Sequence, residues 1–144
     1  MKLQCTSNNL FLIYFILLTS HYAISENKGP KRLQIGIKKR PKNCVGKSKK
    51  GDLLHVHYRG IFEDGTEFDT SYVRQVPFTF TVGSGQVIKG WDQGLIGMCI
   101  GEIRKLVIPP ELGYGKHGVP PTIPGDTNMI QMLCNIELRS CSTT

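Results

Sequence analysis

The residues best suited to bind a ligand form a glycine-rich loop, Gly83–Trp91, which leads into the only tryptophan of the chain. Its three glycines allow the backbone to turn tightly, and Val87, Ile88 and Trp91 give the turn an apolar lining. Two interpretations follow from this stretch alone. Trp91 either fills the core of a small domain or forms the floor of an apolar binding cup, and the rest of the chain must decide.

No pattern for covalent catalysis accompanies this loop. The chain has no GxSxG motif and no P-loop, and Ser84 lacks the strand-to-elbow context of a nucleophile. His55 and His57 share one face of a predicted strand, but no third ligand is placed near them, so we expect no metal and no cofactor. What remains suits an apolar pocket with a few oriented polar groups. Its aromatic members are Tyr58, Phe68, Phe78, Trp91 and Tyr114, and its polar members are Asp69 and Arg74.

The composition is that of a globular protein of one domain, with 144 residues and 40% hydrophobic content. The net charge of +7 arises largely from the basic stretch at residues 28–50. A zinc-finger spacing, an RNP-like aromatic pair and a helix-turn-helix pattern are all missing, so we expect no nucleic-acid partner.

The N-terminus has the layout of a secretory signal peptide, with Lys2, an apolar run at Leu10–Leu18 and small residues at Ala23 and Ser25. We therefore assign residues 1–25 to a cleaved signal peptide, with a retained signal anchor as the alternative. The run is shorter than the ~20 residues that span a bilayer, so we expect no stable membrane insertion after cleavage. The expected location is the endoplasmic reticulum lumen within the secretory pathway, with secretion as the alternative because the chain ends without a KDEL-type signal.

The rest of the chain predicts short strands and one short helix. Leu54, Val56 and Tyr58 alternate with polar residues, and Asp64-Gly65 marks a hairpin between two strand-like stretches. Strands are predicted at about 33–37, 54–59, 66–69, 77–82, 103–108 and 130–138. The result is an α+β fold, in which a twisted antiparallel sheet of five to six strands wraps around the helix after Trp91. Residues 26–50 would supply an N-terminal strand and a basic loop, and residues 51–140 the main domain.

Four cysteines remain after cleavage, namely Cys44, Cys99, Cys134 and Cys141. An oxidising compartment would favour disulfides among them. Three full pairings are possible, and the spacing does not choose between them.

Several ordered blocks stand out along the chain, namely Val56–Gly60, Glu63–Asp69, Gly85–Gly94, Ile108–Gly115 and Ile123-Pro124-Gly125. Together they resemble the signatures of the FKBP-type peptidyl-prolyl cis-trans isomerases, and within that family the small endoplasmic-reticulum branch. The resemblance spans about residues 33–139. It implies a proline isomerase that assists folding in the secretory pathway, acts on proline-containing polypeptides, binds macrolide immunosuppressants and is a monomer. The alternative is a module that binds proline-containing segments without catalysis.

The resemblance also implies the layout of the site. Trp91 would form the floor, the N–H of Ile88 and the hydroxyl of Tyr114 would bind substrate carbonyls, and Asp69 would pair with Arg74. The walls would be Tyr58, Phe68, Phe78, Val87, Ile88 and Ile123.

Two further points come from the same resemblance. The late strand lacks the aromatic side chain that the family usually places on the wall. Either Gln131 or Met132 takes that position, and neither is assigned to the site. Cys44 and Cys99 match the disulfide pair of the endoplasmic-reticulum branch, whereas Cys134 and Cys141 match no cysteine of the family.

Overall fold

The computed structural model describes residues 32–139, with side chains as far as residue 134. The predicted signal peptide at residues 1–25 and Cys141 lie outside the described residues. Within them, no helix has both the length and the apolar character that crossing a bilayer requires.

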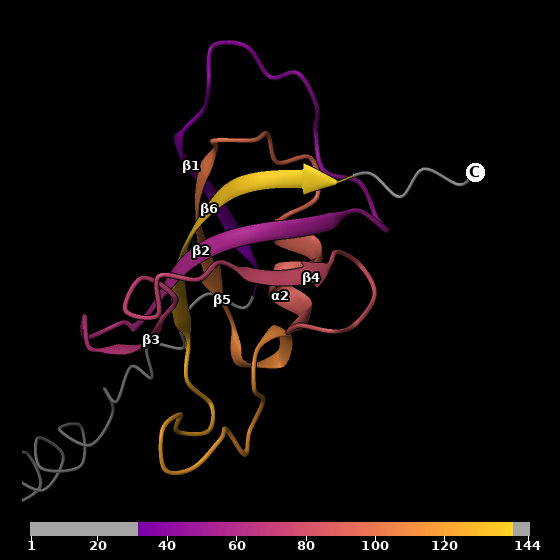
Figure 1. Ribbon diagram of the computed structural model, residues 1–144. Coiled ribbons are helices and arrows are strands. Elements are labelled where there is room, and N and C mark those ends of the chain that lie inside the picture. The colour runs from indigo at the N-terminus through magenta and orange to yellow at the C-terminus, as the bar shows by residue number, and fades with distance from the viewer. Residues whose placement is uncertain (1–31, 140–144) are drawn as a thin grey trace, which may run out of the picture.

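Six strands form one antiparallel sheet, which confirms the predicted α+β fold (Figure 1). They are β1 (Gln34–Lys39), β2 (Leu53–Phe62), β3 (Glu67–Thr70), β4 (Phe78–Thr81), β5 (Ile103–Ile108) and β6 (Met129–Arg139). The strand order is β1-β5-β6-β2-β3, and β4 pairs with the first half of β2, while β3 pairs with its second half. A six-residue α-helix, α2 (Lys89–Gly94), and a 3-10 helix, η1 (Pro110–Leu112), complete the described elements.

One face of the sheet forms the core with α2. Because side chains alternate between the faces of a strand, Leu54, Val56 and Tyr58 of β2 all point to the same side and are buried. Leu106 and Ile108 of β5 join them there. The intervening side chains of β2 remain partly exposed on the other face. The sheet thus has one dry face, and α2 is the α-helix that covers it in the described part of the chain.

The helix α2 packs against β5 at two glycines, Gly90 and Gly94, which are four residues apart and therefore lie on one side of the helix. A Cβ on Gly90 would stand 2.6 Å from Cγ2 of Ile108, and one on Gly94 would stand 2.7 Å from Cδ1 of Leu106. Real Cβ atoms do not come so close to other heavy atoms. Glycine at both positions is therefore what allows the helix to sit this deep.

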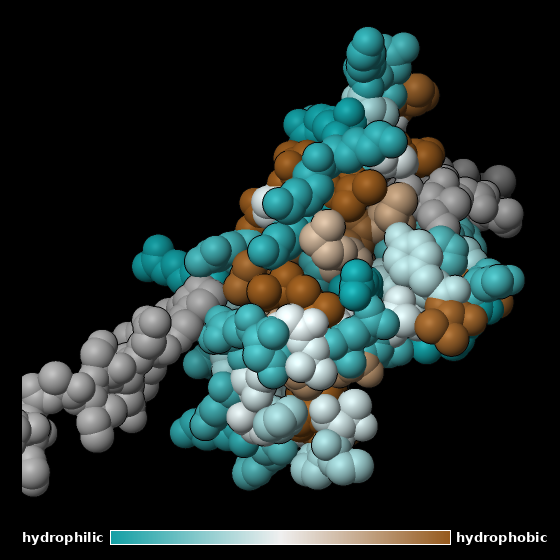
Figure 2. All heavy atoms as spheres, turned by 90° about the vertical axis from the view of Figure 1, so that its left-hand side faces the viewer, coloured by the Kyte–Doolittle hydropathy of each residue, from teal (hydrophilic) through white to brown (hydrophobic). Residues whose placement is uncertain are grey.

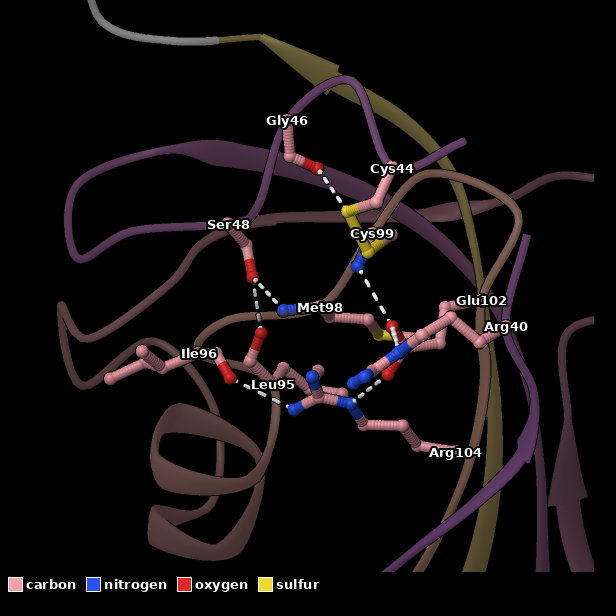
Figure 3. The surroundings of a disulfide bond; sticks show 10 residues. All are labelled: Arg40, Cys44, Gly46, Ser48, Leu95, Ile96, Met98, Cys99, Glu102 and Arg104. Atoms are coloured by element: carbon pink, nitrogen blue, oxygen red, sulfur yellow. Dashed lines mark hydrogen bonds and ion pairs between the residues drawn. A yellow bond between two sulfur atoms is a disulfide. The ribbon is translucent and has the colours of Figure 1, made fainter. Parts of the chain in front are cut away.

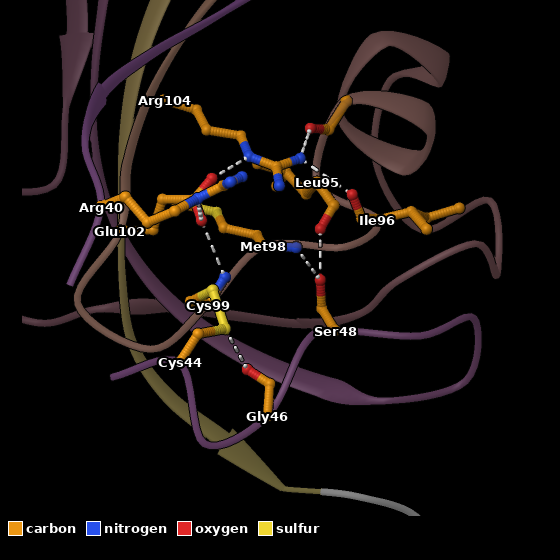
Figure 4. A network of polar contacts seen from close by, with 11 residues as sticks. Arg40, Cys44, Gly46, Ser48, Leu95, Ile96, Met98, Cys99, Glu102 and Arg104 are labelled. Carbon is orange, nitrogen blue, oxygen red and sulfur yellow. Dashed lines mark hydrogen bonds and ion pairs between the residues drawn. A yellow bond between two sulfur atoms is a disulfide. The ribbon is translucent and has the colours of Figure 1, made fainter. Parts of the chain in front are cut away.

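A buried ion pair holds the C-terminal end of α2 (Figure 4). Arg104 donates from Nε to Oε1 of Glu102 at 2.6 Å, and its Nη1 donates to the main-chain carbonyls of Gly94 and Ile96 at 2.7 and 2.8 Å. The guanidinium thereby occupies the carbonyls that end the helix. Glu102 is completely buried, and its second oxygen accepts from Nε of Arg40 at 3.2 Å. Burial acts to raise the pKa of Glu102, but the hydrogen bonds from Arg104 and the Cys99 N–H outweigh it and lower that pKa below its ordinary value.

The Cys44–Cys99 disulfide lies beside this ion pair and confirms the pairing that the family resemblance implied (Figure 3). It joins residues 55 apart in the chain. Ser48 makes a parallel connection, because its hydroxyl donates to the Leu95 carbonyl at 2.5 Å and accepts from the Met98 N–H at 2.9 Å. The basic loop after β1 is thus tied covalently and by hydrogen bonds to the segment after α2.

The surface mixes apolar and polar patches, and the face in Figure 2 shows apolar side chains bordered by hydrophilic ones. The strand β1 lies at one edge of the sheet, and all six of its residues are exposed. Ile35 and Ile37 account for its apolar surface, and Lys38 and Lys39 follow them. Lysines on an edge strand discourage pairing with another sheet.

The depth of α2 can be tested by replacing Gly94 with alanine. We expect Gly94→Ala to lower the free energy of unfolding by about 1–2 kcal/mol, because overpacking against Leu106 outweighs the gain in helix propensity. Urea denaturation measures the change. The matched control is Gln93→Ala, an exposed position of the same helix, where the change should stay within about 0.5 kcal/mol. Equal stability of the two variants would contradict the packing account.

The buried ion pair predicts a pH-dependent contribution to stability. Glu102→Gln leaves the buried Arg104 without a counter-charge and should cost about 3 kcal/mol at pH 7. Because the folded-state pKa of Glu102 is depressed, its contribution is fully present above the unfolded value of about 4.3 and is lost as the pH falls through the folded-state pKa. The stability gap between wild type and variant should therefore narrow in acid.

Urea titrations between pH 7 and pH 3 measure this gap, and the exposed Glu111→Gln controls for the loss of one negative charge. An undiminished gap at the acid end would show that the carboxylate charge of Glu102 is not the source of the stabilisation.

Candidate active site

A cavity of about 470 Å³ opens between the sheet, α2 and the loops at its N-terminal side. This volume lies in the range of small-molecule sites. The lining residues are Tyr58, Phe68, Asp69, Phe78, Gly85, Gln86, Val87, Ile88, Trp91, Tyr114 and Gln131. Eight of these eleven residues are among those that the sequence analysis proposed. We call this cavity the cup.

Trp91 lies at the bottom of the cup and is only 6% exposed. The ring of Tyr58 meets its indole edge-on with centroids 5.1 Å apart, and Phe78 does the same at 5.9 Å. Phe80 packs against Trp91 at 5.7 Å but is not a lining residue, so it supports the indole from the core side. These distances are typical of stabilising aromatic pairs. The indole is part of the core and also lines a cavity, so the core position of Trp91 leaves its role as the floor of a binding cup as a prediction.

Three polar side chains at one wall are bonded to one another. The hydroxyl of Tyr58 donates to Oδ2 of Asp69, and Nη1 of Arg74 donates to Oδ1 of the same carboxylate at 3.0 Å. Nη2 of Arg74 also donates to the Tyr58 hydroxyl oxygen at 2.7 Å, and the guanidinium carbon lies 5.7 Å from the Tyr58 ring centroid. The charge of the Asp69 carboxylate is therefore balanced by Arg74, and the carboxylate holds the Tyr58 ring at a fixed angle.

The protonation states of these groups follow from the same contacts. Burial acts to raise the pKa of Asp69, but the hydrogen bonds from Tyr58 and Arg74 prevail and lower it below its ordinary value. Burial, with the hydrogen bond to Asp69, raises the pKa of Tyr58. Burial also raises the pKa of Tyr114, and the negative charge of Asp69 adds to that effect. Near neutral pH the cup therefore holds one ionised carboxylate and two neutral phenols.

The loop before α2 is held by a carboxylate of the helix itself. Asp92 accepts from the N–H of Gly83 through Oδ1 and from the N–H of Gly85 through Oδ2, both at 2.8 Å. Both glycines have positive φ, 74° and 78°, which side chains with a Cβ rarely adopt. This arrangement places Val87 and Ile88 against the cup.

Two of the proposed site residues are not lining residues. Arg74 acts through Asp69 and Tyr58 as described, and it is the predicted partner of Asp69. Ile123 is 7% exposed and belongs to the hydrophobic core, where it pairs with Val119 across the late loop.

Three lining residues were not assigned from the sequence, namely Gly85, Gln86 and Gln131. Gly85 and Gln86 lie in the loop that was proposed as the lining, and the amide oxygen of Gln86 accepts from the Thr81 N–H at 2.9 Å. Gln131 lies between Met129 and Leu133, both fully buried, and the period of two along β6 would have placed it on the same face. The structure thus selects Gln131 over Met132 as the residue at the wall.

The two histidines of β2 form hydrogen bonds on the face of the sheet that is opposite the core. Nδ1 of His55 lies 2.8 Å from the Thr79 hydroxyl, and Nδ1 of His57 lies 2.9 Å from that of Ser71. Among residues 32–139 no three His, Cys, Asp or Glu side chains come together in a way that could hold a metal ion.

Comparisons with known proteins point to one family. Residues 44–133 match the family described as FKBP-type peptidyl-prolyl cis-trans isomerase. The chain is 55% identical over 133 residues to the peptidyl-prolyl cis-trans isomerase FKBP2 of Mus musculus, covering 91% of this chain and 95% of the relative. It is 62% identical over 103 residues to FKBP2 of Homo sapiens, covering 72% of each chain. It is 50% identical over 122 residues to FK506-binding protein 2 of Dictyostelium discoideum, covering 83% and 92%.

The loop contacts of Asp92 can be tested by hydrogen exchange. Asp92→Ala removes the acceptors of two main-chain amides, and we expect exchange at Gly83 and Gly85 to become at least about fivefold faster, because hydrogen bonds to charged groups are worth about 1.5–3 kcal/mol. NMR-detected exchange measures both amides. Asp64→Ala is the matched control, since it removes a carboxylate that accepts from the Thr66 N–H in the hairpin. Unchanged protection at Gly83 and Gly85 would show that Asp92 does not hold the loop.

Proposed function

This chain belongs to the family of FKBP-type peptidyl-prolyl cis-trans isomerases and is an enzyme of that kind, and we propose that it accelerates X-Pro isomerisation in proteins that fold in the secretory pathway. The observation that carries the mechanism is the cup, a cavity floored by Trp91 and walled by aromatic side chains. In this proposal the proline ring enters the cup and rests on the indole.

An apolar cup suits this reaction because no bond is broken. Rotation about a peptide bond has a barrier of ~18–20 kcal/mol, since twisting destroys the amide resonance. The twisted amide is less polar than the planar one, so a dry aromatic environment favours it over the ground state. Only such differential binding speeds the reaction. A preference of about 7 kcal/mol would correspond to roughly 10⁵-fold acceleration.

Hydrogen bonds to the flanking carbonyls would hold the peptide while the amide turns. The N–H of Ile88 is the first candidate, because Ile88 lines the cup directly before α2. The carbonyl of Ile88 accepts from the N–H of Trp91 at 2.9 Å, which holds this main-chain segment close to the floor. The hydroxyl of Tyr114 is the second, since this side chain lines the cup and is 40% exposed at its rim. The carboxylate of Asp69 is occupied by Tyr58 and Arg74, so its part is to fix the wall.

The same cup would bind macrolide immunosuppressants. Its volume of about 470 Å³ admits a ring with its flanking groups, and its rim offers both an aromatic surface and hydrogen-bond donors. A relative from Dictyostelium discoideum carries the name FK506-binding protein 2. We place macrolide binding at the proline site, so that a macrolide competes with the substrate.

The proposed location in the secretory pathway, in the endoplasmic reticulum lumen, agrees with two features. The first is the predicted signal peptide at residues 1–25. The second is the disulfide between Cys44 and Cys99, since such bonds persist in oxidising compartments. We propose that the mature protein acts there as a monomer.

A protease-coupled assay on a short X-Pro peptide tests the proposed mechanism. We expect acceleration that a macrolide abolishes, together with a change in fluorescence of Trp91, which is the only tryptophan of the chain. Tight macrolide binding without acceleration would instead identify a module that binds proline-containing segments. Acceleration that persists at saturating macrolide would place the reaction outside the cup.

The contribution of the rim hydroxyl can be measured with Tyr114→Phe. We expect kcat/KM to fall about two- to tenfold, because one hydrogen bond contributes about 0.5–1.5 kcal/mol. Tyr72→Phe is the matched control, since Tyr72 is 54% exposed and does not line the cup. Equal activity of the two variants would remove Tyr114 from the substrate contacts.

A further inference from the structure

The side of the sheet opposite α2 carries apolar side chains where an antiparallel sheet usually presents polar ones to water. Because side chains alternate between the two faces of a strand, the neighbours of the buried Leu106 in β5 and Leu133 in β6 point away from the core. Six side chains of this side are apolar and partly exposed. They are Ile61, Ile103, Val107, Ile130, Met132 and Cys134.

The register of the strands brings these six side chains together. Val107, Ile130 and Ile61 pair in one row across β5, β6 and β2. Ile103 pairs with Cys134 in a second row, and the sixth residue lies between the two rows. Figure 2 looks at the side of the molecule that faces away from α2, and apolar side chains gather there with hydrophilic ones around them. We call this surface, made of the six residues, the outer face.

Two lysines of the outer face have no carboxylate partner. Lys39 of β1 pairs with Ile103 at its border, and Lys105 pairs with Met132 at its centre. No carboxylate of the described residues lies within ion-pair distance of either lysine. Burial raises the pKa of the Cys134 thiol, and the positive charge of Lys39 opposes that effect, so this charge acts on the outer face.

The excess of positive charge continues beyond β1. Arg59 also lies on this side of the sheet, but Glu67 balances its charge. The basic stretch after β1 has seven lysines and arginines and no acidic residue between positions 38 and 50, and the disulfide between Cys44 and Cys99 holds that stretch in place. The outer face is thus apolar at its centre and positive along the border formed by β1.

These two features together select the kind of partner. A second copy of the chain would bring two positive borders close together, and like charges across an interface oppose association. A bilayer does not match, because the apolar side chains are only partly exposed and none stands out far enough to be inserted among lipids. An amphipathic polypeptide segment can cover the apolar centre with one side and place carboxylates against the lysines.

We propose that the outer face docks an acidic amphipathic segment of another polypeptide, with Lys39 and Lys105 as the residues that pair with its carboxylates. Tyr58 and Gln131 line the cup from the opposite side of β2 and β6, so docking on the outer face leaves the cup open. The inference goes beyond the proposed function and does not depend on it.

A synthetic helical peptide with leucines along one side and glutamates along the other is the probe. We expect it to bind the mature, disulfide-bonded protein, as measured by fluorescence anisotropy, and to shift the NMR amide signals of β1, β5 and β6. The double variant Lys39→Glu/Lys105→Glu should weaken this binding about tenfold or more, because two attractive charge pairs become repulsive. The matched control is Lys89→Glu/Lys116→Glu, which changes the net charge equally at two exposed lysines outside the outer face and should bind as the wild type does.

The apolar centre is tested with Met132→Gln, which keeps the length of the side chain and makes it polar. Binding of the probe should weaken about threefold or more, because less apolar surface is buried, while kcat/KM on an X-Pro peptide stays unchanged. A peptide with the composition of the probe but a scrambled order should also bind at least about threefold more weakly, since its leucines no longer share one side of the helix.

Three outcomes would overturn the inference. The first is equal binding by the two double variants, and the second is a set of amide shifts that lies outside the outer face. The third is binding to vesicles of phosphatidylserine and phosphatidylcholine without binding of the probe, which would make the outer face a membrane contact. If a variant does not fold, the wild-type shift map and the scrambled peptide still decide.

Discussion

The close approach of α2 to β5 is the constraint on which the rest of the structure depends. Without side chains at Gly90 and Gly94, the helix backbone lies directly against Ile108 and Leu106. Trp91 follows Gly90 and is thereby carried to the middle of the sheet, where its indole meets aromatic rings from β2 and β4. A helix of six residues has little stability alone, so this packing both forms the helix and locates the floor of the cup.

Charged side chains secure the two ends of this short helix. Arg104 binds the carbonyls at its C-terminal end, and Glu102 holds that guanidinium in place from a fully buried position. Asp92, inside the helix, binds the loop that precedes it. Because one element carries the floor and fixes the adjoining wall, the distance between Trp91 and the Gly83–Ile88 loop is set by a single rigid unit.

Local sequence patterns predicted the strands well and the helix less well. The apolar alternation and the flanking turns placed the strand at 103–108, where the structure has β5. The helix was expected after Trp91 but begins at Lys89, because its N-cap is Ile88 and the usual polar capping signal is missing.

The site shows the same division between local and long-range information. Most lining residues come from the family blocks, although Ile123 of the last block does not line the cup. The sequence leaves Gln131 unassigned, because either it or Met132 could take the wall position at which the family usually has an aromatic side chain. The period of two along β6 predicts that Gln131 lies on the same face of the sheet as the buried Met129 and Leu133. The contact between Ser48 and Leu95 and the bond between Arg40 and Glu102 join distant segments, and no local pattern encodes them.

The distribution of polar groups in the cup separates its wall from its floor. At the exposed wall, Tyr58, Asp69 and Arg74 satisfy one another, so they offer a substrate no unpaired hydrogen-bonding group. The floor is the buried indole of Trp91. An apolar floor favours a twisted amide over a planar one whatever residues flank it, so it contributes to rate and not to selection. Selection among the groups on either side of a proline would therefore fall to the exposed rim, where Tyr114 lies.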